Sequence, residues 1–226
     1  MSRTRLSIIA IAGLALAAGV AAQSEFKHEY AIGASFGMGV SSVSFVPSVQ
    51  EKQLLGARAG LTFRWLTESF AGLILELNYS QEGWEERFDD PAFSYTRRLN
   101  YVDIPLLSHF YYGKRTRFFF NIGPKIGFMV GESTTGKFDS PPPVDEITGR
   151  LHTSEQWDMR VENKLAWGLC GGPGFELHTR IGIFQLEGRY YYSLGDIFGN
   201  RKADHFSKSS GQVIFGKLTY LIPLKK

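Results

Sequence analysis

Apolar and polar residues alternate along most of this chain with a period of two. From Tyr30 to Val40, every even position is apolar or aromatic, and the positions between them are alanine, glycine and serine. The segments 55–65 and 71–80 repeat the alternation, with arginine, glutamate, asparagine and small residues on their second face. Successive side chains of a strand point to opposite faces, so this pattern predicts strands with one apolar and one polar face.

Five further segments alternate in the same way, which brings the number of predicted strands to eight. The predicted strands cover residues 30–40, 55–65, 71–80, 102–112, 117–130, 165–177, 184–194 and 214–222. Pro105, Pro124 and Pro173 fall inside three of them, and each removes one backbone donor from a ladder. We therefore expect a bulge or a locally broken ladder at each proline.

The connections between these segments alternate between long and short. Tight links such as LTES, GKRTR and HTR separate gaps of about 14 residues or more, of which the gap after residue 130 is the longest. This alternation is typical of an up-and-down barrel, whose tight turns face the periplasm when it lies in an outer membrane. The predicted fold class is all-β, an eight-stranded antiparallel up-and-down transmembrane β-barrel.

The choice of the lipid-facing side follows from the size of the barrel. Eight strands enclose a narrow interior that side chains fill. Glycines and paired charges fit there, whereas a full set of leucine and phenylalanine side chains would crowd it. We therefore assign the apolar face to lipid and the polar face to the lumen. The alternative is a soluble, lipocalin-like binder of small ligands with the opposite arrangement.

Charged and amide side chains on the polar face are predicted to form a structural network in the lumen. Buried charges are costly unless they are paired, so these groups should contact one another. A path for protons or ions is the alternative reading. The predicted lumen network consists of Glu76, Asn78, Lys125, Glu176, Glu187 and Arg189.

Aromatic residues on the apolar face gather toward the two ends of the predicted strands. Two such bands are typical of the girdles that barrels place at the membrane interfaces, although strands are rich in aromatic residues in general. The predicted girdle consists of Trp65, Phe70, Tyr79, Tyr112, Phe118, Phe128, Trp167 and Tyr192.

The first 22 residues have the features of a secretory signal peptide. A basic head with Arg3 and Arg5 precedes an apolar stretch, and small residues end it at Ala22. We predict cleavage there, with residues 23–226 forming one barrel domain in the outer membrane. An uncleaved N-terminal membrane helix is the alternative. No later run reaches the roughly 18 apolar residues of a membrane helix.

Charge and cysteine content exclude some classes of function. The chain has 25 basic and 22 acidic residues without a polybasic field, so no nucleic-acid partner is predicted. Cys170 is the only cysteine and cannot form an intramolecular disulfide.

Four segments together resemble the PorT-like family of outer-membrane β-barrel proteins. They are LELNYSQEG, YVDIPLLSHFYYG, FNIGPKIGFMVG and LEGRYYYSLGDI, in the order and spacing of that family. The resemblance implies an eight-stranded barrel in the outer membrane of a Gram-negative bacterium. It also implies a connection with protein secretion by the type IX route or with envelope assembly. The C-terminal sequence LTYLIPLKK departs from the terminal aromatic residue of many such barrels.

No constellation typical of an enzyme or a metal site emerges from the sequence. Ser108 and His109 are adjacent, so a strand sends them to opposite faces. The remaining candidate for an enzyme at the barrel rim is the group of His152, Ser154, Glu155 and Asp158 in the longest gap, together with His205. The five histidines are scattered, FDDP lacks spaced oxygen ligands for calcium, and GLCGGPG lacks the lysine of a phosphate loop.

We therefore expect no catalytic activity, no cofactor and no metal, and a structural or interaction role. The predicted partners are outer-membrane lipid and proteins that contact the long outward loops, above all residues 131–164. An open pore is not expected from eight strands. The sequence does not indicate an oligomeric state.

Overall fold

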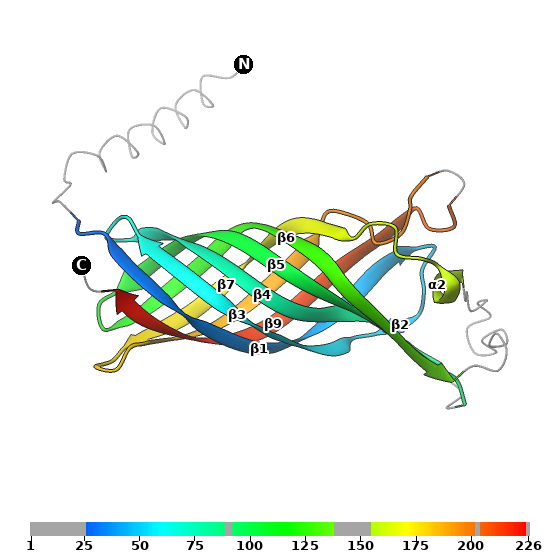
Figure 1. The fold of residues 1–226 in the computed structure, drawn as a ribbon, viewed down its shortest axis with the longest axis horizontal. Helices are drawn as coiled ribbons and strands as arrows, with labels where there is room; N and C mark the ends of the chain where they lie inside the picture. The colour runs from blue at the N-terminus through cyan, green and yellow to red at the C-terminus, as the bar shows by residue number, and fades with distance from the viewer. Residues whose placement is uncertain (1–25, 89–91, 138–154, 202–203, 225–226) are drawn as a thin grey trace, which may run out of the picture.

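The computed structural model describes residues 26–88, 92–137, 155–201 and 204–224, and these form one tilted β-barrel (Figure 1). The predicted signal segment 1–22 lies outside the described residues. One short helix, α2 (Glu155–Asp158), precedes β7. The strands are β1 (Glu29–Val46), β2 (Glu51–Lys52), β3 (Leu54–Leu66), β4 (Ala71–Glu86), β5 (Ser94–Gly113), β6 (Thr116–Lys137), β7 (Leu165–His178), β8 (Ile183–Ser193) and β9 (Lys208–Leu224).

Eight of the strands close into an antiparallel ring, which confirms the predicted fold class. The order is β4, β3, β1, β9, β8, β7, β6 and β5, and pairing between β4 and β5 closes it. The additional strand β2 pairs only with the last residues of β4. Within the described ranges, no helix has the length and apolar character needed to cross a membrane.

The ring is staggered. Stepping through paired residues from Tyr30 around all eight strands returns to β1 at Val40 instead of Tyr30. A stagger of this kind tilts the strands against the barrel axis and narrows the interior enough for side chains to fill it. The lumen of this protein is therefore a packed core.

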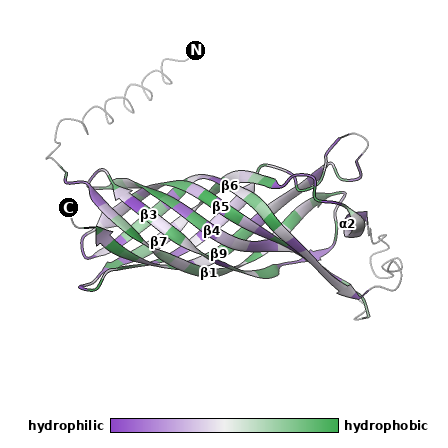
Figure 2. Ribbon diagram, in the orientation of Figure 1, coloured by the Kyte–Doolittle hydropathy of each residue, from purple (hydrophilic) through white to green (hydrophobic). Residues whose placement is uncertain are grey.

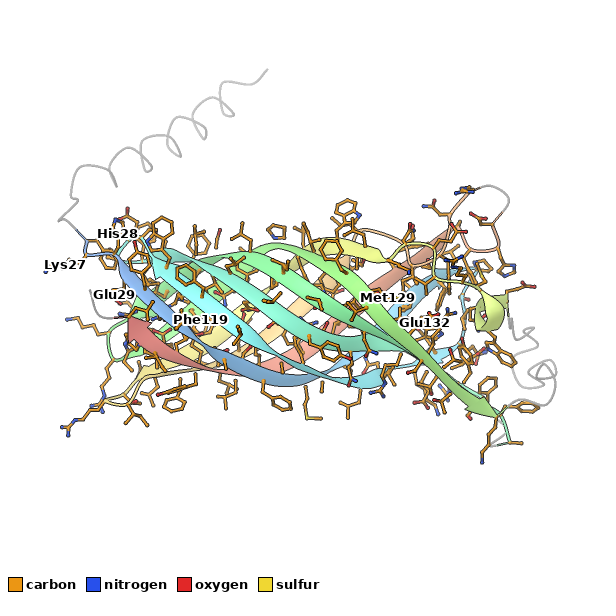
Figure 3. The ribbon with its side chains drawn as sticks, in the orientation of Figure 1. Lys27, His28, Glu29, Phe119, Met129 and Glu132 are labelled. Atoms are coloured by element: carbon orange, nitrogen blue, oxygen red, sulfur yellow. The ribbon has the colours of Figure 1, made fainter. Side chains whose placement is uncertain are left out.

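Apolar side chains face outward and polar ones face inward along the middle of the ring, as predicted (Figure 3). Hydrophobic and hydrophilic residues alternate along the strands (Figure 2). On β4, Leu75 and Leu77 are 45% and 50% exposed, whereas Glu76 and Asn78, which alternate with them, are 2% and 1% exposed. The soluble lipocalin-like alternative is therefore wrong, because its exterior would be polar.

The three prolines interrupt ladders, as the sequence indicated. Pairing between β4 and β5 stops at Pro105, pairing between β5 and β6 stops at Pro124, and pairing between β7 and β8 stops at Pro173. The register is the same on both sides of each interruption. Each proline still pairs with its other neighbouring strand, so the ladder is locally broken without a bulge.

The strands extend further into the predicted loops than the alternation indicated. β4 continues to Glu86 and β5 begins at Ser94, so most of the predicted connection 81–101 is strand. β6 continues to Lys137, which takes it into the first part of the longest predicted connection. A bulge lies between Asn100 and Tyr101, close to the point where β6 loses its pairing with β7 while β5 stays paired with β4. Beyond the lipid these residues need no apolar outer face, so a search for lipid-facing alternation misses them.

A hydrophobic cluster closes the long-loop end of the barrel, and the sequence-based prediction missed it. It joins the ends of β1, β4 and β5 to the segments that precede β7 and β9. We call this cluster the extracellular cap. Its buried members are Val43, Phe45, Trp84, Tyr95, Leu99, Tyr101, Val161, Ile197, Phe198 and Phe206.

Candidate functional site

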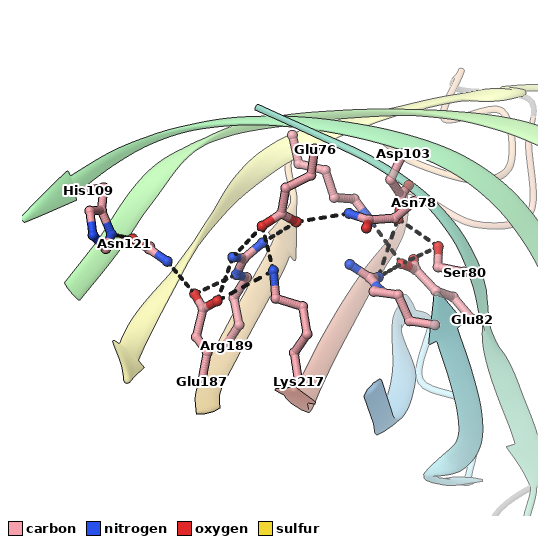
Figure 4. Close-up of polar contacts among 12 residues, drawn as sticks. Glu76, Asn78, Ser80, Glu82, Asp103, His109, Asn121, Glu187, Arg189 and Lys217 are labelled. Carbon is pink, nitrogen blue, oxygen red and sulfur yellow. Dashed lines mark hydrogen bonds and ion pairs between the residues drawn. The ribbon is translucent and has the colours of Figure 1, made fainter. Parts of the chain in front are cut away.

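The middle of the lumen contains a cluster of two carboxylates and two cations, which we call the central ion cluster (Figure 4). Arg189 on β8 donates from Nη1 and Nη2 to the two carboxylate oxygens of Glu76 on β4, at 2.9 Å each. Its Nε and Nη2 also donate to Glu187, at 2.8 and 2.7 Å. Lys217 on β9 contacts Glu76 and lies 3.5 Å from Glu187. The four formal charges therefore cancel.

Amide side chains extend the central ion cluster in two directions. Asn78 donates to Glu76 at 2.9 Å, and Asn121 donates to Glu187 at 2.9 Å. The Oδ1 of Asn121 lies 2.7 Å from Nδ1 of His109, whose ring is fully buried. These bonds give a second donor to carboxylate oxygens that already accept from Arg189, and they connect His109 to the central ion cluster.

A second group, the upper ion cluster, lies nearer the cap. Lys125 on β6 donates to Glu82 at 2.7 Å and to Asp103 at 3.2 Å. Arg58 on β3 reaches the same two carboxylates, at 2.7 and 3.3 Å. Ser80 donates to Asp103 at 2.6 Å. This cluster also pairs two cations with two carboxylates.

A third group, the lower ion cluster, closes the short-turn end around Glu176 on β7. Its carboxylate pairs with the buried Arg64 on β3 and lies 3.5 Å from Arg117 on β6. Gln185 donates to it at 2.6 Å, and the ring of His178 also contacts it. One carboxylate therefore organises side chains from four strands.

The structure places all six residues of the predicted lumen network inside the ring, and each is less than 4% exposed. They are divided among the three clusters. The central ion cluster contains Glu76, Asn78, Glu187 and Arg189, the upper ion cluster contains Lys125, and the lower ion cluster contains Glu176. The prediction missed Arg58, Arg64, Glu82, Asp103, Asn121 and Lys217 as members. Five of these residues lie on the lumen side of the predicted strands, so the alternation could have identified them. Glu82 lies beyond the end of the predicted strand 71–80 and carried no such signal.

The extracellular cap blocks the barrel mouth above the upper ion cluster. The ring of Phe45 lies 5.3 Å from that of Trp84 and 5.1 Å from that of Phe206. The guanidinium of Arg97 lies over Phe198 at 5.4 Å and over Trp84 at 5.7 Å. These edge-on and tilted ring contacts and the cation–π contacts leave the mouth filled with side chains.

Helix α2 is attached to the cap by polar contacts. Glu86 at the end of β4 accepts from Nε2 of Gln156 at 3.1 Å and from Nε1 of Trp157 at 2.6 Å. Arg97 donates to the backbone oxygen of Gln156 at 3.0 Å. The described end of the longest connection is therefore fixed over the mouth.

The eight predicted girdle residues all lie on the outside of the ring. Trp65 and Tyr192 are half-buried against neighbours, and the other six are exposed. Tyr79 and Phe128 are both paired with Val102 across β5, so they lie at one level on the cap side. Tyr112 and Phe118 pair beside the β5–β6 turn, at the opposite end.

The candidate catalytic residues do not form a constellation in the described ranges. Ser108 faces outward and is half-buried, whereas His109 is buried in the lumen, as expected for neighbours on a strand. His152 and Ser154 lie outside the described residues. Among the residues the structure describes, no three histidine, cysteine, aspartate or glutamate side chains meet in a way that could hold a metal ion.

Comparison with known proteins identifies the same architecture. A family model described as "Outer membrane protein beta-barrel domain" matches residues 21–199. No curated protein matches the chain. Among solved structures, the outer membrane protein OprG from Pseudomonas aeruginosa aligns with a TM-score of 0.52 at 13% identity, covering 88% of this chain and 97% of OprG.

Two other small barrels align over similar lengths with lower scores. Ail, the attachment invasion locus protein of Yersinia pestis, in complex with sucrose octasulfate, is 14% identical, with a TM-score of 0.43 and coverage of 86% and 99%. Neisserial surface protein A is 9% identical, with a TM-score of 0.43 and coverage of 86% and 99%. At these identities the likeness to OprG concerns the fold alone.

Proposed function

The chain belongs to the outer membrane protein beta-barrel domain family, and on that premise we propose that it is a closed barrel with a structural or interaction role. Its location is the outer membrane, where lipid surrounds the ring. We propose that its function depends on the surface it presents outside the membrane, without transport through the lumen and without catalysis.

The filled lumen is the observation that carries this proposal. Three ion clusters occupy successive levels of the interior, and the extracellular cap lies above them. An ion or solute crossing the barrel would have to separate buried ion pairs, and breaking such a pair by removing one partner costs about 3–5 kcal/mol. A lumen of this kind favours a rigid anchor over a channel.

The part of the surface best suited to a protein contact is the paired end of β5 and β6, residues 94–100 and 131–137. We call it the β5–β6 projection. Beyond Met129, β6 pairs with β5 on one side only, so in the described residues the edge from Gly131 to Lys137 has no second strand (Figure 1). Exposed strand edges can add an extended segment of another protein. Glu132, which pairs with Arg97 at 3.1 Å, marks the base of this projection (Figure 3).

Conductance across a planar lipid bilayer tests the closed lumen. We expect the wild-type protein to give no stable channel. A sixteen-stranded porin, which leaves an aqueous channel, is measured in the same bilayer to show that the assay can detect a channel. A stable wild-type channel would overturn the proposal.

The contact surface is tested in cells with a photo-crosslinking residue at Thr134 on the exposed edge. We expect crosslinks to a defined envelope protein there and none from a matched position at Arg180 in the β7–β8 turn. Equal crosslinking at both positions, or none at Thr134, would contradict an edge-mediated contact.

Participation in protein secretion or envelope assembly belongs to the same proposal, and it is supported by the PorT-like resemblance of four segments alone. Deletion of the gene should then reduce the amount of secreted or surface-attached protein. Restoration by the wild type but not by a variant lacking residues 131–137 would connect this role to the projection. An unchanged secreted fraction in the deletion strain would refute it.

A further inference from the structure

Two of the three tight turns carry exposed cations. Lys114 and Arg115 occupy the β5–β6 turn, and Arg180 occupies the β7–β8 turn, and all three are exposed. The backbone nitrogen of His178 donates to the oxygen of Arg115 at 2.9 Å, so the two turns are held side by side. Among the described residues, no carboxylate lies within 4 Å of any of these three cationic groups.

The carboxylate of Glu176, close to both turns, is already paired with cations. Glu176 contacts Arg64, Arg117 and His178 inside the lower ion cluster. Arg117 is also held by its own turn, because its Nε donates to the oxygen of Lys114 at 3.2 Å and its guanidinium lies 4.6 Å from the ring of Tyr111. The charge that the two turns present to the outside is therefore positive.

A group of apolar side chains, which we call the apolar ledge, borders these cations on the lipid-facing side. It consists of Tyr112, Phe118, Phe175 and Ile181. Tyr112 is 86% exposed and Ile181 is 74% exposed, and both adjoin the turns. Phe118 and Phe175 lie next to them with ring centroids 5.3 Å apart in an edge-to-face arrangement. Aromatic side chains of this kind lie at the level of lipid headgroups.

The third tight turn has the opposite charge. Residues 67–70, which join β3 to β4, contain Glu68 and no basic residue. At the start of β1, Lys27 and Glu29 place both signs close together (Figure 3). In the described part of the chain, the exposed cations of the tight turns therefore lie on the side of the barrel formed by β5 to β8.

We propose that the β5–β6 and β7–β8 turns bind the phosphate-bearing headgroup of an anionic phospholipid in the inner leaflet of the outer membrane. Lys114, Arg115 and Arg180 attract the phosphate, and the ledge of Tyr112 and Phe118 accepts the upper part of the acyl chains. The lipid is favoured over an acidic protein because the cations and the ledge adjoin at membrane depth. This inference rests on the outer-membrane orientation of the barrel and not on its proposed contact function.

Electron spin resonance of reconstituted protein tests this directly. Spin-labelled phosphatidylglycerol and spin-labelled phosphatidylcholine are added in turn to phosphatidylcholine bilayers that contain the barrel, and the motionally restricted fraction is measured. Each Lys or Arg near a membrane surface strengthens the binding of anionic lipid roughly five-fold. We therefore expect phosphatidylglycerol to be enriched over phosphatidylcholine next to the protein by at least that factor. The enrichment should fall in high salt.

The variant Lys114→Gln/Arg115→Gln/Arg180→Gln should bind both lipids equally. The matched control, Lys137→Gln/Arg160→Gln/Lys164→Gln, removes three exposed cations from the opposite end and should keep the enrichment. The proposal is overturned if the wild-type protein shows no preference for phosphatidylglycerol over phosphatidylcholine. That result is expected if the turns bind an acidic periplasmic protein instead of lipid. Equal loss in both variants would overturn it too, since overall charge would then explain the effect.

Discussion

Arg189 on β8 and Glu76 on β4 join directly opposite sides of the eight-stranded ring through two hydrogen bonds of 2.9 Å. Both residues are 2% exposed. A bidentate pair across the barrel couples strands that are far apart in the ladder, so it resists flattening and slippage of the ring. The lumen charges thus act as cross-braces of the fold.

Replacing Arg189 with methionine should destabilise the barrel strongly. The change keeps much of the side-chain volume but leaves Glu76 and Glu187 with only Lys217 as a cation. An unpaired buried charge of this kind costs about 3–5 kcal/mol. Urea unfolding in lipid vesicles, followed by the change in gel mobility between folded and unfolded protein, measures the loss.

The double variant Arg189→Met/Glu76→Gln should recover part of that stability, because it restores neutrality with one carboxylate and one cation. A double variant no more stable than Arg189→Met would show that shape, and not charge balance, holds the central ion cluster together.

Trp84→Ala should loosen the extracellular cap and leave the ring intact. Trp84 is fully buried between Phe45 and Phe198, and truncating a buried aromatic residue costs about 3–5 kcal/mol. We expect faster amide hydrogen exchange at Val43, Leu99 and Ile197, with unchanged exchange in the lumen-facing part of β4. Trp84→Phe serves as the milder control. Equal acceleration in cap and ring would mean that the two unfold together.

The separation between ring and cap explains what the sequence could and could not predict. Within the ring, the alternation around Glu76 and Leu77 follows from local strand geometry, so faces and strand number were predictable. The missing backbone donor predicted an irregularity at Pro105, Pro124 and Pro173, either a bulge or a broken ladder, but not which of the two. Each of these features depends on neighbours along one strand.

The cap depends on contacts between segments that are distant in sequence. Phe45, Trp84 and Phe206 lie beyond the ends of three different predicted strands, and no periodic pattern links them. The same holds for the partners of Lys217, whose carboxylates lie on β4 and β8. The alternation gives the direction of such a side chain, but the partner across the lumen depends on the stagger of the closed ring.

Glu51 should make the cap end of the barrel less stable as the pH rises. Burial raises the pKa of this carboxyl to about 7, and its oxygens accept from the backbone nitrogen of Val43 at 3.0 and 3.1 Å. The folded state therefore holds a proton that the unfolded state loses above about pH 4.5. The stabilisation is complete below that pH and is lost between about pH 4.5 and 7. Because the side chain is partly exposed, we expect a change of only about 1 kcal/mol.

Glu51→Gln removes this titration, so its urea midpoint should follow a flatter curve than the wild type between pH 4.5 and 7. Glu85→Gln, at a half-buried neighbour on β4, is the matched control and should keep the wild-type slope. Parallel curves for wild type and Glu51→Gln would rule out the titration of Glu51.

Cys170 should be unreactive in the folded protein. Its side chain is 5% exposed and packs in the lumen with Leu107 and Tyr191. A charged maleimide added to reconstituted protein should label it only after urea unfolding. The variant Cys170→Ser/Lys137→Cys, whose thiol lies at the exposed end of β6, should label at once. Rapid labelling of the wild type would indicate a water-filled lumen.

The central claim is that lipid surrounds the apolar face of the ring while the ends lie in water. It is tested most directly by spin labels placed, in a Cys170→Ser background, at Leu61, Leu75, Leu106, Lys114 and Lys137. In lipid bilayers, labels at the three leucines should collide with oxygen and be protected from a water-soluble nickel chelate. Labels at the two lysines should show the reverse. Access of the nickel chelate to all five positions would contradict a membrane-spanning barrel with this face outward.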